Sequence, residues 1–273
     1  MRTRDERLGG VLTTRLMNRA STKHLVVVLY VLAGILLAVS LVPFLYQYGA
    51  AAGSYRDVVP AFGNARVLTA LWLSLLSALV TTFLAVIFGV PLAYFFARKE
   101  FSGKALVETL AVDVPQTFPP VAEGMIFLLM LGPESPLHLN LAFTFTALVI
   151  AKFYISAPFV VSFTARRFRE IERSGINLTA RALGATPFQV FLTIFVPLGL
   201  KDIGAGASLC WSRAMGELGG SLLFAGVVAG KTEIIPTFIA TQAQSLTALA
   251  LAATILVTTA STVALTSFKY LSR

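Results

Sequence analysis

The segment NLTARALGATPFQVFLTIFVPL, residues 177–198, is rich in residues that begin and end helices, although the chain around it is mostly long apolar sequence. Asn177 can cap a first helix, and Gly184 is the residue type that most readily ends a helix in the left-handed conformation. The TPFQ sequence that begins at Thr186 is a capping box with proline at the first helical position. The segment therefore predicts two short helices joined by a tight corner.

The second half of this segment, FQVFLTIFVPL at 188–198, is apolar but too short to cross a membrane. A bilayer core of about 30 Å needs about 20 apolar residues in a helix, and this stretch is about half as long and contains Pro197. The first helix, of about six residues, is not stable alone and needs a partner surface on this chain or on another protein. A helix pair lying beneath the lipid headgroups is the alternative.

The composition of the whole chain is that of a polytopic membrane protein. Of the 273 residues, 56% are hydrophobic and 13% are charged, and the mean hydropathy is +0.80, far from the values of soluble domains. We expect an all-α fold with six transmembrane helices, at about 25–46, 67–97, 105–131, 141–165, 203–228 and 243–268. PQTFPP at 115–120 interrupts the third stretch.

The first stretch has a second interpretation, because a basic segment followed by apolar residues is also typical of a cleaved signal peptide. Its apolar run is longer than the usual core of about 7–15 residues in such peptides. We therefore expect an uncleaved membrane anchor that follows a basic cytoplasmic N-terminus at 1–24.

The distribution of basic residues predicts the orientation. The net charge of +9 would suggest nucleic acid for a soluble protein, but here 17 of the 22 Lys and Arg residues fall on one set of loops and three on the other. Cytoplasmic loops carry the excess of Lys and Arg. We therefore expect a multi-pass protein of the cell membrane, with both termini and the helix pair, at about 174–200, in the cytoplasm. With one cysteine and two distant histidines, the sequence predicts neither a disulfide nor a metal site, and no cofactor.

The helix pair resembles the signature loop of importer-type ABC transporter permeases, which runs Glu-Ala-Ala, three residues, Gly, nine residues, Ile, any residue, Leu-Pro. Ala180, Gly184, Ile194 and Pro197 fall at the family spacing, whereas Leu178 replaces the family Glu; Thr179 and Val196 also depart from it. The resemblance implies that the pair docks into a groove of a cytoplasmic ATPase. The implied coupling residues are Thr179, Ala180, Arg181, Gly184, Ala185, Thr186, Pro187 and Phe188.

Three further segments look like the molybdate, tungstate and sulfate branch of that family. They are FGVPLAYFFARKEFSGK (88–104), VPQTFPPVAEG (114–124) and WSRAMGELGGSLLFAG (211–226). The resemblance implies a type I ABC importer permease fold, with 25–273 as the transmembrane domain of a homodimer whose pathway lies between the copies. Two ATPase subunits and an extracytoplasmic substrate-binding protein are the implied partners, and the implied cargo is molybdate or tungstate, then sulfate. The chain itself is not expected to be an enzyme; import of another small solute is the alternative.

Charges within the expected spans are candidates for the pathway or its gate, because they are costly in a membrane. Arg213 and Glu217 match family residues and stand four apart, so we expect them to share a helix face and neutralise each other. Glu123 replaces a small apolar residue of the family. A carboxylate there would repel a dianion unless it is protonated or paired with Lys152 or Arg213, or the cargo is not a dianion. The other candidates are Thr117, Pro119, Pro120, Ser212 and Ser221, whose hydroxyls alternatively bond their own helix carbonyls.

Other functions find less support in the sequence. AGVVAGKT at 225–232 resembles a phosphate-binding loop, but Ala225 stands where the motif needs glycine and the expected topology places the loop outside the cell. An intramembrane enzyme would need acids such as Glu123 and Glu217, but no catalytic spacing accompanies them. A secondary transporter coupled through Glu123 is a further alternative, although no internal repeat is visible.

Overall fold

The computed structural model describes residues 4–242 and 247–271, and the side chains of residues 25–242, 247–267 and 270. Every regular element in these ranges is helical. The chain divides into two units, Met1–Ser54 and Tyr55–Arg273. The helix α1 (Arg4–Gly53) makes up the first unit, and its part Leu25–Gly53 is long and apolar enough to cross a membrane.

The prediction of an all-α protein with six apolar spans is confirmed. Five helices pass the length and hydropathy test, and a sixth span results if the bent pair Lys104–Thr117 and Pro120–Leu131 is counted as one. The two halves of that pair meet at 113°. The break falls on the PQTFPP sequence, because Phe118 and Pro119 are extended and Pro119 and Pro120 cannot donate backbone hydrogen bonds to continue the helix.

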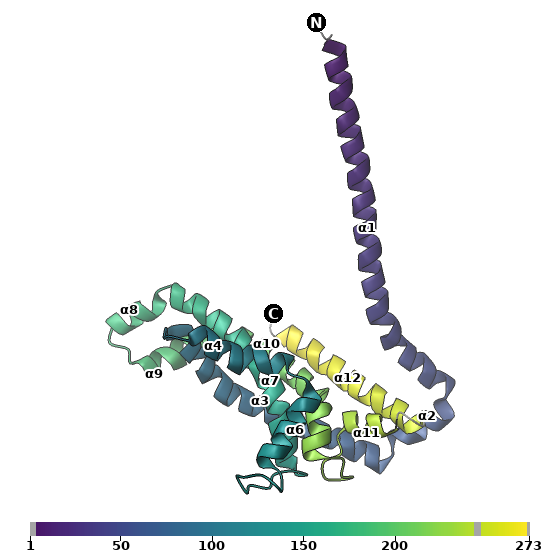
Figure 1. Cartoon of the computed structure of the whole chain (residues 1–273), viewed down its shortest axis with the longest axis vertical. Helices are drawn as coiled ribbons and strands as arrows, with labels where there is room; N and C mark the ends of the chain where they lie inside the picture. The colour runs from purple at the N-terminus through teal and green to yellow at the C-terminus, as the bar shows by residue number, and fades with distance from the viewer. Residues whose placement is uncertain (1–3, 243–246, 272–273) are drawn as a thin grey trace. The chain divides into compact units, whose positions relative to one another are not determined.

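Figure 1 shows the helices of the second unit, in which α3 (Ala65–Arg98), α7 (Phe145–Arg173) and α10 (Val196–Met215) supply most of one core cluster. The long helices are α3 (Ala65–Arg98), α7 (Phe145–Arg173), α10 (Val196–Met215) and α12 (Ala248–Leu271). The shorter ones are α2 (Tyr55–Phe62), α4 (Lys104–Glu108), η1 (Thr109–Asp113), α5 (Val114–Thr117), α6 (Pro120–Leu131), α8 (Ile176–Ala182), α9 (Pro187–Val190), η2 (Phe191–Phe195), η3 (Ser221–Ala225) and α11 (Ile235–Gln242).

The fifth span differs from the expected stretch at 203–228. The helix begins at Pro187 and runs through α9, η2 and α10 to Met215, so that 188–198 is the first part of this span rather than a separate helix. Pro197 does not end the helix, because the π-helical turn η2 directly before it already shifts the hydrogen-bond pattern and accommodates a residue without an N–H. The expectation that 188–198 is separate from the spans was therefore wrong.

The other spans agree with the expected ones within a few residues at most ends. The fourth, expected at 141–165, begins after the cap Thr144 and extends to Arg173. The sixth, expected at 243–268, is α12, and the first residues of the expected range, 243–246, lie outside the described residues. Apolar length sets the middle of a helix, whereas local caps such as Thr144 set its ends.

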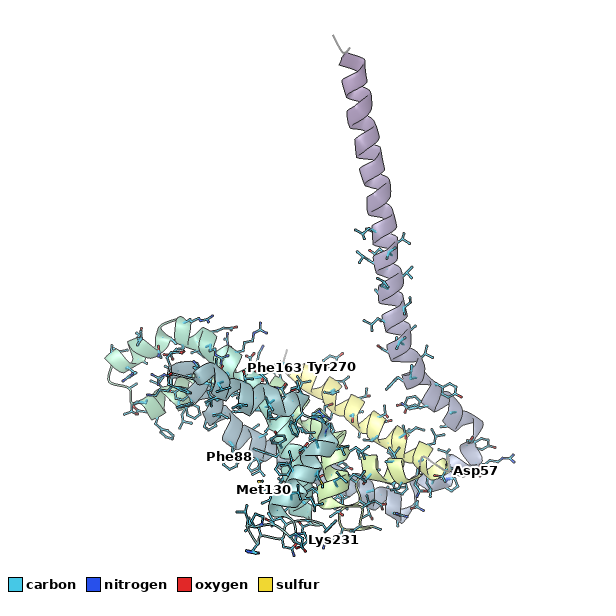
Figure 2. All side chains as sticks on the ribbon, in the orientation of Figure 1. Asp57, Phe88, Met130, Phe163, Lys231 and Tyr270 are labelled. Carbon is cyan, nitrogen blue, oxygen red and sulfur yellow. The ribbon has the colours of Figure 1, made fainter. Side chains whose placement is uncertain are left out.

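Two loops lie at the end of this unit where Figure 2 labels Met130 and Lys231. The loop after α6 is joined to η3, directly before the segment 226–234, by a backbone hydrogen bond from the Phe143 N–H to the Phe224 carbonyl, at 3.1 Å. Near the same segment, Arg66 at the start of α3 donates two hydrogen bonds of 2.7 Å to the Glu233 carboxylate. Glu233 is 1% exposed, whereas Arg66 is about half exposed.

Glu233→Gln is expected to lower the melting temperature of the detergent-solubilised protein by about 5 °C, because it removes the charge of a buried glutamate that accepts two hydrogen bonds from Arg66. The matched control is Glu100→Gln, which breaks the 2.6 Å pair with Lys104 at a glutamate that is 85% exposed. An exposed pair contributes little, so this control should leave the melting temperature unchanged. Equal shifts in the two variants would contradict the prediction.

Candidate functional site

The predicted tight corner is present between α8 and α9. Gly184 adopts φ +92°, the left-handed conformation that the sequence predicts at this position. The Thr186 N–H donates to Gln189 Oε1 at 2.8 Å and the Gln189 N–H donates to Thr186 Oγ1 at 3.3 Å. The capping box with Pro187 at the first helical position is therefore confirmed.

The start of the first helix differs from the prediction. Gly175, at φ +76°, precedes α8, and Asn177 lies within the helix instead of capping it. The Asn177 side chain is buried, and its Nδ2 donates to Glu172 Oε1 at 2.8 Å. Asn177 therefore links α8 to the end of α7, whereas a capping residue would bond the start of its own helix.

The corner is anchored by aromatic side chains at its base and exposes apolar side chains at its tip. The Tyr94 ring of α3 lies 4.8 Å from the Phe191 ring and 4.9 Å from the Phe195 ring, centroid to centroid. At the tip, Leu183 is 84% exposed, and Leu178 and Phe188 are also exposed. Figure 1 shows α8 and α9 together at one end of the second unit. Large exposed apolar side chains on a rigid support are typical of an interaction surface.

A second candidate site forms where the broken third span meets the segment that follows α10. This segment, residues 216–225, contains Gly219, Gly220 and η3. A Cβ built on Gly219 would lie 2.8 Å from the Pro120 carbonyl carbon, and one built on Gly124 would lie 2.9 Å from the Gly220 Cα. The backbones of α6 and the 216–225 segment are therefore in direct contact, which only glycine allows here.

The expected pair between Arg213 and Glu217 is not among the ion pairs of the described residues, because α10 ends at Met215 and Glu217 lies beyond its last turn. The Glu217 carboxylate instead accepts hydrogen bonds from the Gly220 N–H at 2.8 Å, the Ser221 N–H at 3.0 Å and the Ser221 hydroxyl. Glu217 therefore caps the helical turn that leads into η3.

Glu123 is enclosed by the chain's own helices. Its side chain is 1% exposed and that of Lys152 on α7 is 0% exposed. Neither carboxylate oxygen of Glu123 nor the Lys152 Nζ has a hydrogen-bond partner in the part of the chain that the structure describes. Glu217 accepts a hydrogen bond from the Gly220 N–H, and a Cβ built on Gly220 would lie 3.2 Å from the Glu123 carboxyl group and 3.3 Å from the Cβ of Ala151, the neighbour of Lys152. The structure thus gathers Glu123, Lys152 and Glu217, from three segments, around the 219–221 turn.

The remaining candidates lie in or near the two breaks. Pro119 and Pro120 begin α6, and Ser212 is half-buried on α10. The Thr117 hydroxyl donates to the Asp113 and Val114 carbonyls at 3.2 and 3.1 Å. This agrees with the alternative interpretation, in which the hydroxyl bonds carbonyls of its own helix. Among the described residues, no group of three or more His, Cys, Asp or Glu side chains could hold a metal ion.

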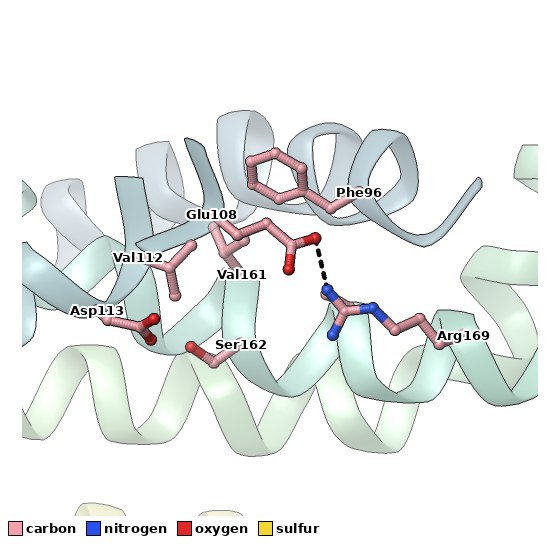
Figure 3. Close-up of a pocket in the computed structure, with 8 residues that line it drawn as sticks. Phe96, Glu108, Val112, Asp113, Val161, Ser162 and Arg169 are labelled. Carbon is pink, nitrogen blue, oxygen red and sulfur yellow. Dashed lines mark hydrogen bonds and ion pairs between the residues drawn. The ribbon is translucent and has the colours of Figure 1, made fainter. Parts of the chain in front are cut away.

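Figure 3 shows a polar cavity between α4, η1 and α7 that the sequence analysis did not predict. It measures about 200 Å³ and contains the ion pair of Arg169 Nη2 with Glu108 Oε1 at 2.7 Å, beside Asp113 and Ser162. Glu108 and Arg169 are 61 residues apart in the chain. Only the packing of α4 and η1 against α7 brings them together, and no local pattern could have predicted it.

Comparison with known proteins agrees with this architecture. The family described as "Binding-protein-dependent transport system inner membrane component" matches residues 85–273. The molybdate/tungstate transport system permease protein WtpB of Thermococcus kodakarensis is 34% identical over 190 residues, which is 70% of this chain and 74% of that protein. The molybdenum transport system permease protein ModB of Escherichia coli K12 is 31% identical over 190 residues, with 64% of this chain and 80% of that protein covered.

The fold also matches a solved structure. A bacterial ABC transporter involved in the import of the acidic polysaccharide alginate has a chain that superimposes with a TM-score of 0.69, covering 95% of this chain and 98% of that chain. At 17% identity, this likeness concerns the fold alone. Taken with the family match over most of the chain, it leads to one conclusion: this protein belongs to the family of binding-protein-dependent transport system inner membrane components, the permeases of ABC importers.

Proposed function

We propose that the chain is the permease subunit of an ATP-driven importer for a tetrahedral oxyanion, with molybdate or tungstate as the main cargo and sulfate next. The observation that supports this cargo is the set of relatives at 31–35% identity that are named as molybdate, tungstate or molybdenum permeases. Another small solute is the alternative cargo. ATP hydrolysis belongs to a partner subunit, and the permease itself forms no covalent bond with its cargo.

The α8–α9 corner is the proposed site of coupling to the ATPase. Its tip exposes Leu178, Leu183 and Phe188, and its base is fixed by the aromatic contacts with Tyr94. A docked helix pair of this kind transmits the motion of the ATPase as a rigid unit to the fifth span, because α9 continues directly into α10. The residues that we assign to coupling are Thr179, Ala180, Arg181, Gly184, Ala185, Thr186, Pro187 and Phe188.

The proposed assembly is a homodimer with two ATPase subunits at the corners and a substrate-binding protein on the opposite side. The excess of Lys and Arg beside the corner supports a cytoplasmic location for it and for both termini. A related solved transporter is described in complex with a periplasmic protein that carries an alginate pentasaccharide. In this assembly Thr117, Pro119, Pro120, Glu123, Ser212, Arg213, Glu217 and Ser221 belong to the pathway or to its gate.

Uptake by reconstituted vesicles tests this function. The permease, the ATPase and the substrate-binding protein are placed in proteoliposomes, and radiolabelled molybdate, tungstate and sulfate are offered on the side of the binding protein. ATP-dependent accumulation of molybdate or tungstate is the expected result. Accumulation of none of these anions would contradict the cargo, and accumulation without any ATPase would contradict the ABC mechanism and favour a secondary transporter.

Leu183→Asp is expected to weaken binding of the ATPase about tenfold, because a charge would replace an apolar side chain that the groove buries. Since Leu183 is 84% exposed in the free chain, the melting temperature of the permease alone should stay the same. The control is Leu137→Asp on the loop after α6, at a leucine that is 54% exposed. Pull-down titration of the two variants with the ATPase measures the effect, and equal weakening by both would contradict docking at the corner.

A further inference from the structure

An apolar groove lies beside the polar cavity of Figure 3. It lies between α3, the broken third span and α7, and its volume of about 450 Å³ is within the range of about 300–1,000 Å³ that ligand pockets have. Phe88 and Leu110 in its lining are 61% and 57% exposed, so the groove opens at the surface of the unit. Val161 lines both the groove and the polar cavity, so the two spaces adjoin.

The length of the groove corresponds to one leaflet of a membrane. Its lining residues on α7 run from Ile150 to Val161, which is about 16 Å of helix, and half of a hydrocarbon core of about 30 Å is about 15 Å. The lining of the polar cavity continues along α7 from Ser162 to Arg169, about one turn before the helix ends at Arg173. An apolar groove of this length with charged groups at its end fits a phospholipid, which has an acyl chain and a polar head group.

The charged groups of the polar cavity indicate the chemistry of the head group. Arg169 Nη2 donates to Glu108 Oε1 at 2.7 Å, and a guanidinium has further N–H groups that suit phosphate oxygens. Asp113 is exposed and has no ion-pair partner in the part of the chain that the structure describes. The two carboxylates exceed the charge of the guanidinium. A head group with both a phosphate and an ammonium complements this set, because an ammonium donates hydrogen bonds to carboxylates.

We propose that the apolar groove and the polar cavity together bind one phospholipid whose head group carries a phosphate and a primary ammonium, as in phosphatidylethanolamine. One acyl chain lies in the groove, the phosphate binds Arg169, and the ammonium binds Glu108 and Asp113. Because the bound lipid contacts α3, η1 and α7 together, it stabilises the packing of the broken third span against the neighbouring spans. The inference goes beyond the proposed function and does not depend on the cargo.

The first test compares three lipids on the full-length permease, purified and delipidated in detergent. Dioleoyl phosphatidylethanolamine should raise the melting temperature by about 4 °C, because a ligand that binds only the folded protein stabilises it. Dioleoyl phosphatidylcholine, whose ammonium has no N–H, and dioleoyl phosphatidylglycerol, which has no ammonium, should raise it by less than about 1 °C. No shift with phosphatidylethanolamine, or an equal shift with either of the other lipids, would overturn the proposal.

The second test removes the carboxylate that has no ion pair. Asp113→Asn should reduce the shift caused by phosphatidylethanolamine from about 4 °C to about 1 °C, because the ammonium loses a charged acceptor. The lipid-free protein should melt at the same temperature as the wild type, since Asp113 is exposed. Asp57→Asn, the same substitution at an exposed aspartate of α2, is the matched control and should keep the full shift. A full shift in Asp113→Asn would contradict the assigned head group and overturn the proposal.

The third test locates the acyl chain. The permease is illuminated with a phosphatidylethanolamine that carries a photoreactive diazirine in one acyl chain, and the labelled peptides are identified by mass spectrometry. Labelled peptides from the α3, η1 and α7 walls of the groove are the expected result. Ala111→Trp should reduce this labelling about tenfold, because Ala111 lines the groove and is exposed, so that the larger side chain fills the groove without entering the core. Labelling confined to other surfaces, or a groove closed to the lipid by a second copy of the chain, would overturn the proposal.

Discussion

Gly184→Val is expected to reduce ATP-driven uptake by about 100-fold while the protein still inserts into the membrane. Gly184 holds φ +92° between α8 and α9, a conformation that costs other residues about 1–3 kcal/mol and β-branched residues more. A Cβ at this position meets no atom within 4 Å, so the whole effect comes from the backbone. Valine would move the backbone out of the left-handed region and change the direction of α8 relative to α9.

Gly184→Asn is the matched control for this prediction. Asparagine adopts the left-handed conformation more readily than other non-glycine residues, and the open space around the position accepts its side chain. This variant should keep most of the uptake. Comparison of ATP hydrolysis with uptake in the same vesicles shows whether valine uncouples the two. Equal uptake by the valine and asparagine variants would show that the corner geometry does not matter for coupling.

Local sequence chemistry predicted this corner because each of its parts acts within a few residues. The capping box, the proline at the first helical position and the left-handed glycine depend on neighbours no more than three positions away. Asn177 was misassigned for the same reason. A cap and a tertiary hydrogen bond both call for a short amide side chain, and only the packing of α8 against Glu172 distinguishes them.

The contacts of the buried charged residues could not be predicted from the sequence. Residue spacing placed Arg213 and Glu217 on one helix face, but the helix ends between them at Gly216, and the Glu217 side chain turns to the next segment. The spacing of residues along a helix does not predict where that helix ends. The meeting of Glu123, Lys152 and Glu217 depends on three segments far apart in the chain, so only the fold reveals it.

Pro197 illustrates a further limit. A proline in an apolar stretch indicates that a helix ends, and on that ground, together with its short length, 188–198 was expected to be separate from the spans. The π-helical turn η2 removes that conflict, and the helix continues to Met215. Such turns have no reliable sequence signature, because they are single-turn irregularities within an otherwise ordinary helix. A continuous helix therefore joins the corner to the break at Gly216.

Gly219→Val is expected to lower uptake to below about 1% of the wild-type rate, the largest effect in the membrane part of the protein. The added side chain would begin 2.8 Å from the Pro120 carbonyl carbon and from the Val121 nitrogen. Because these are backbone atoms, no side-chain rotation relieves the clash, and α6 must move away from the 216–225 segment. The apolar spans that drive membrane insertion are unchanged.

Gly124→Val tests the same contact from its other side, since its Cβ would lie 2.9 Å from the Gly220 Cα. Two substitutions that break one contact should not add, so the double variant should transport no worse than either single one within about twofold. Gly216→Ala is the control, because its nearest contacts are 3.9 and 4.0 Å and its φ of −91° suits alanine. If Gly219→Val and Gly216→Ala transport equally well, the contact between α6 and the 216–225 segment is not part of the gate, and a pathway through the two broken helices is wrong.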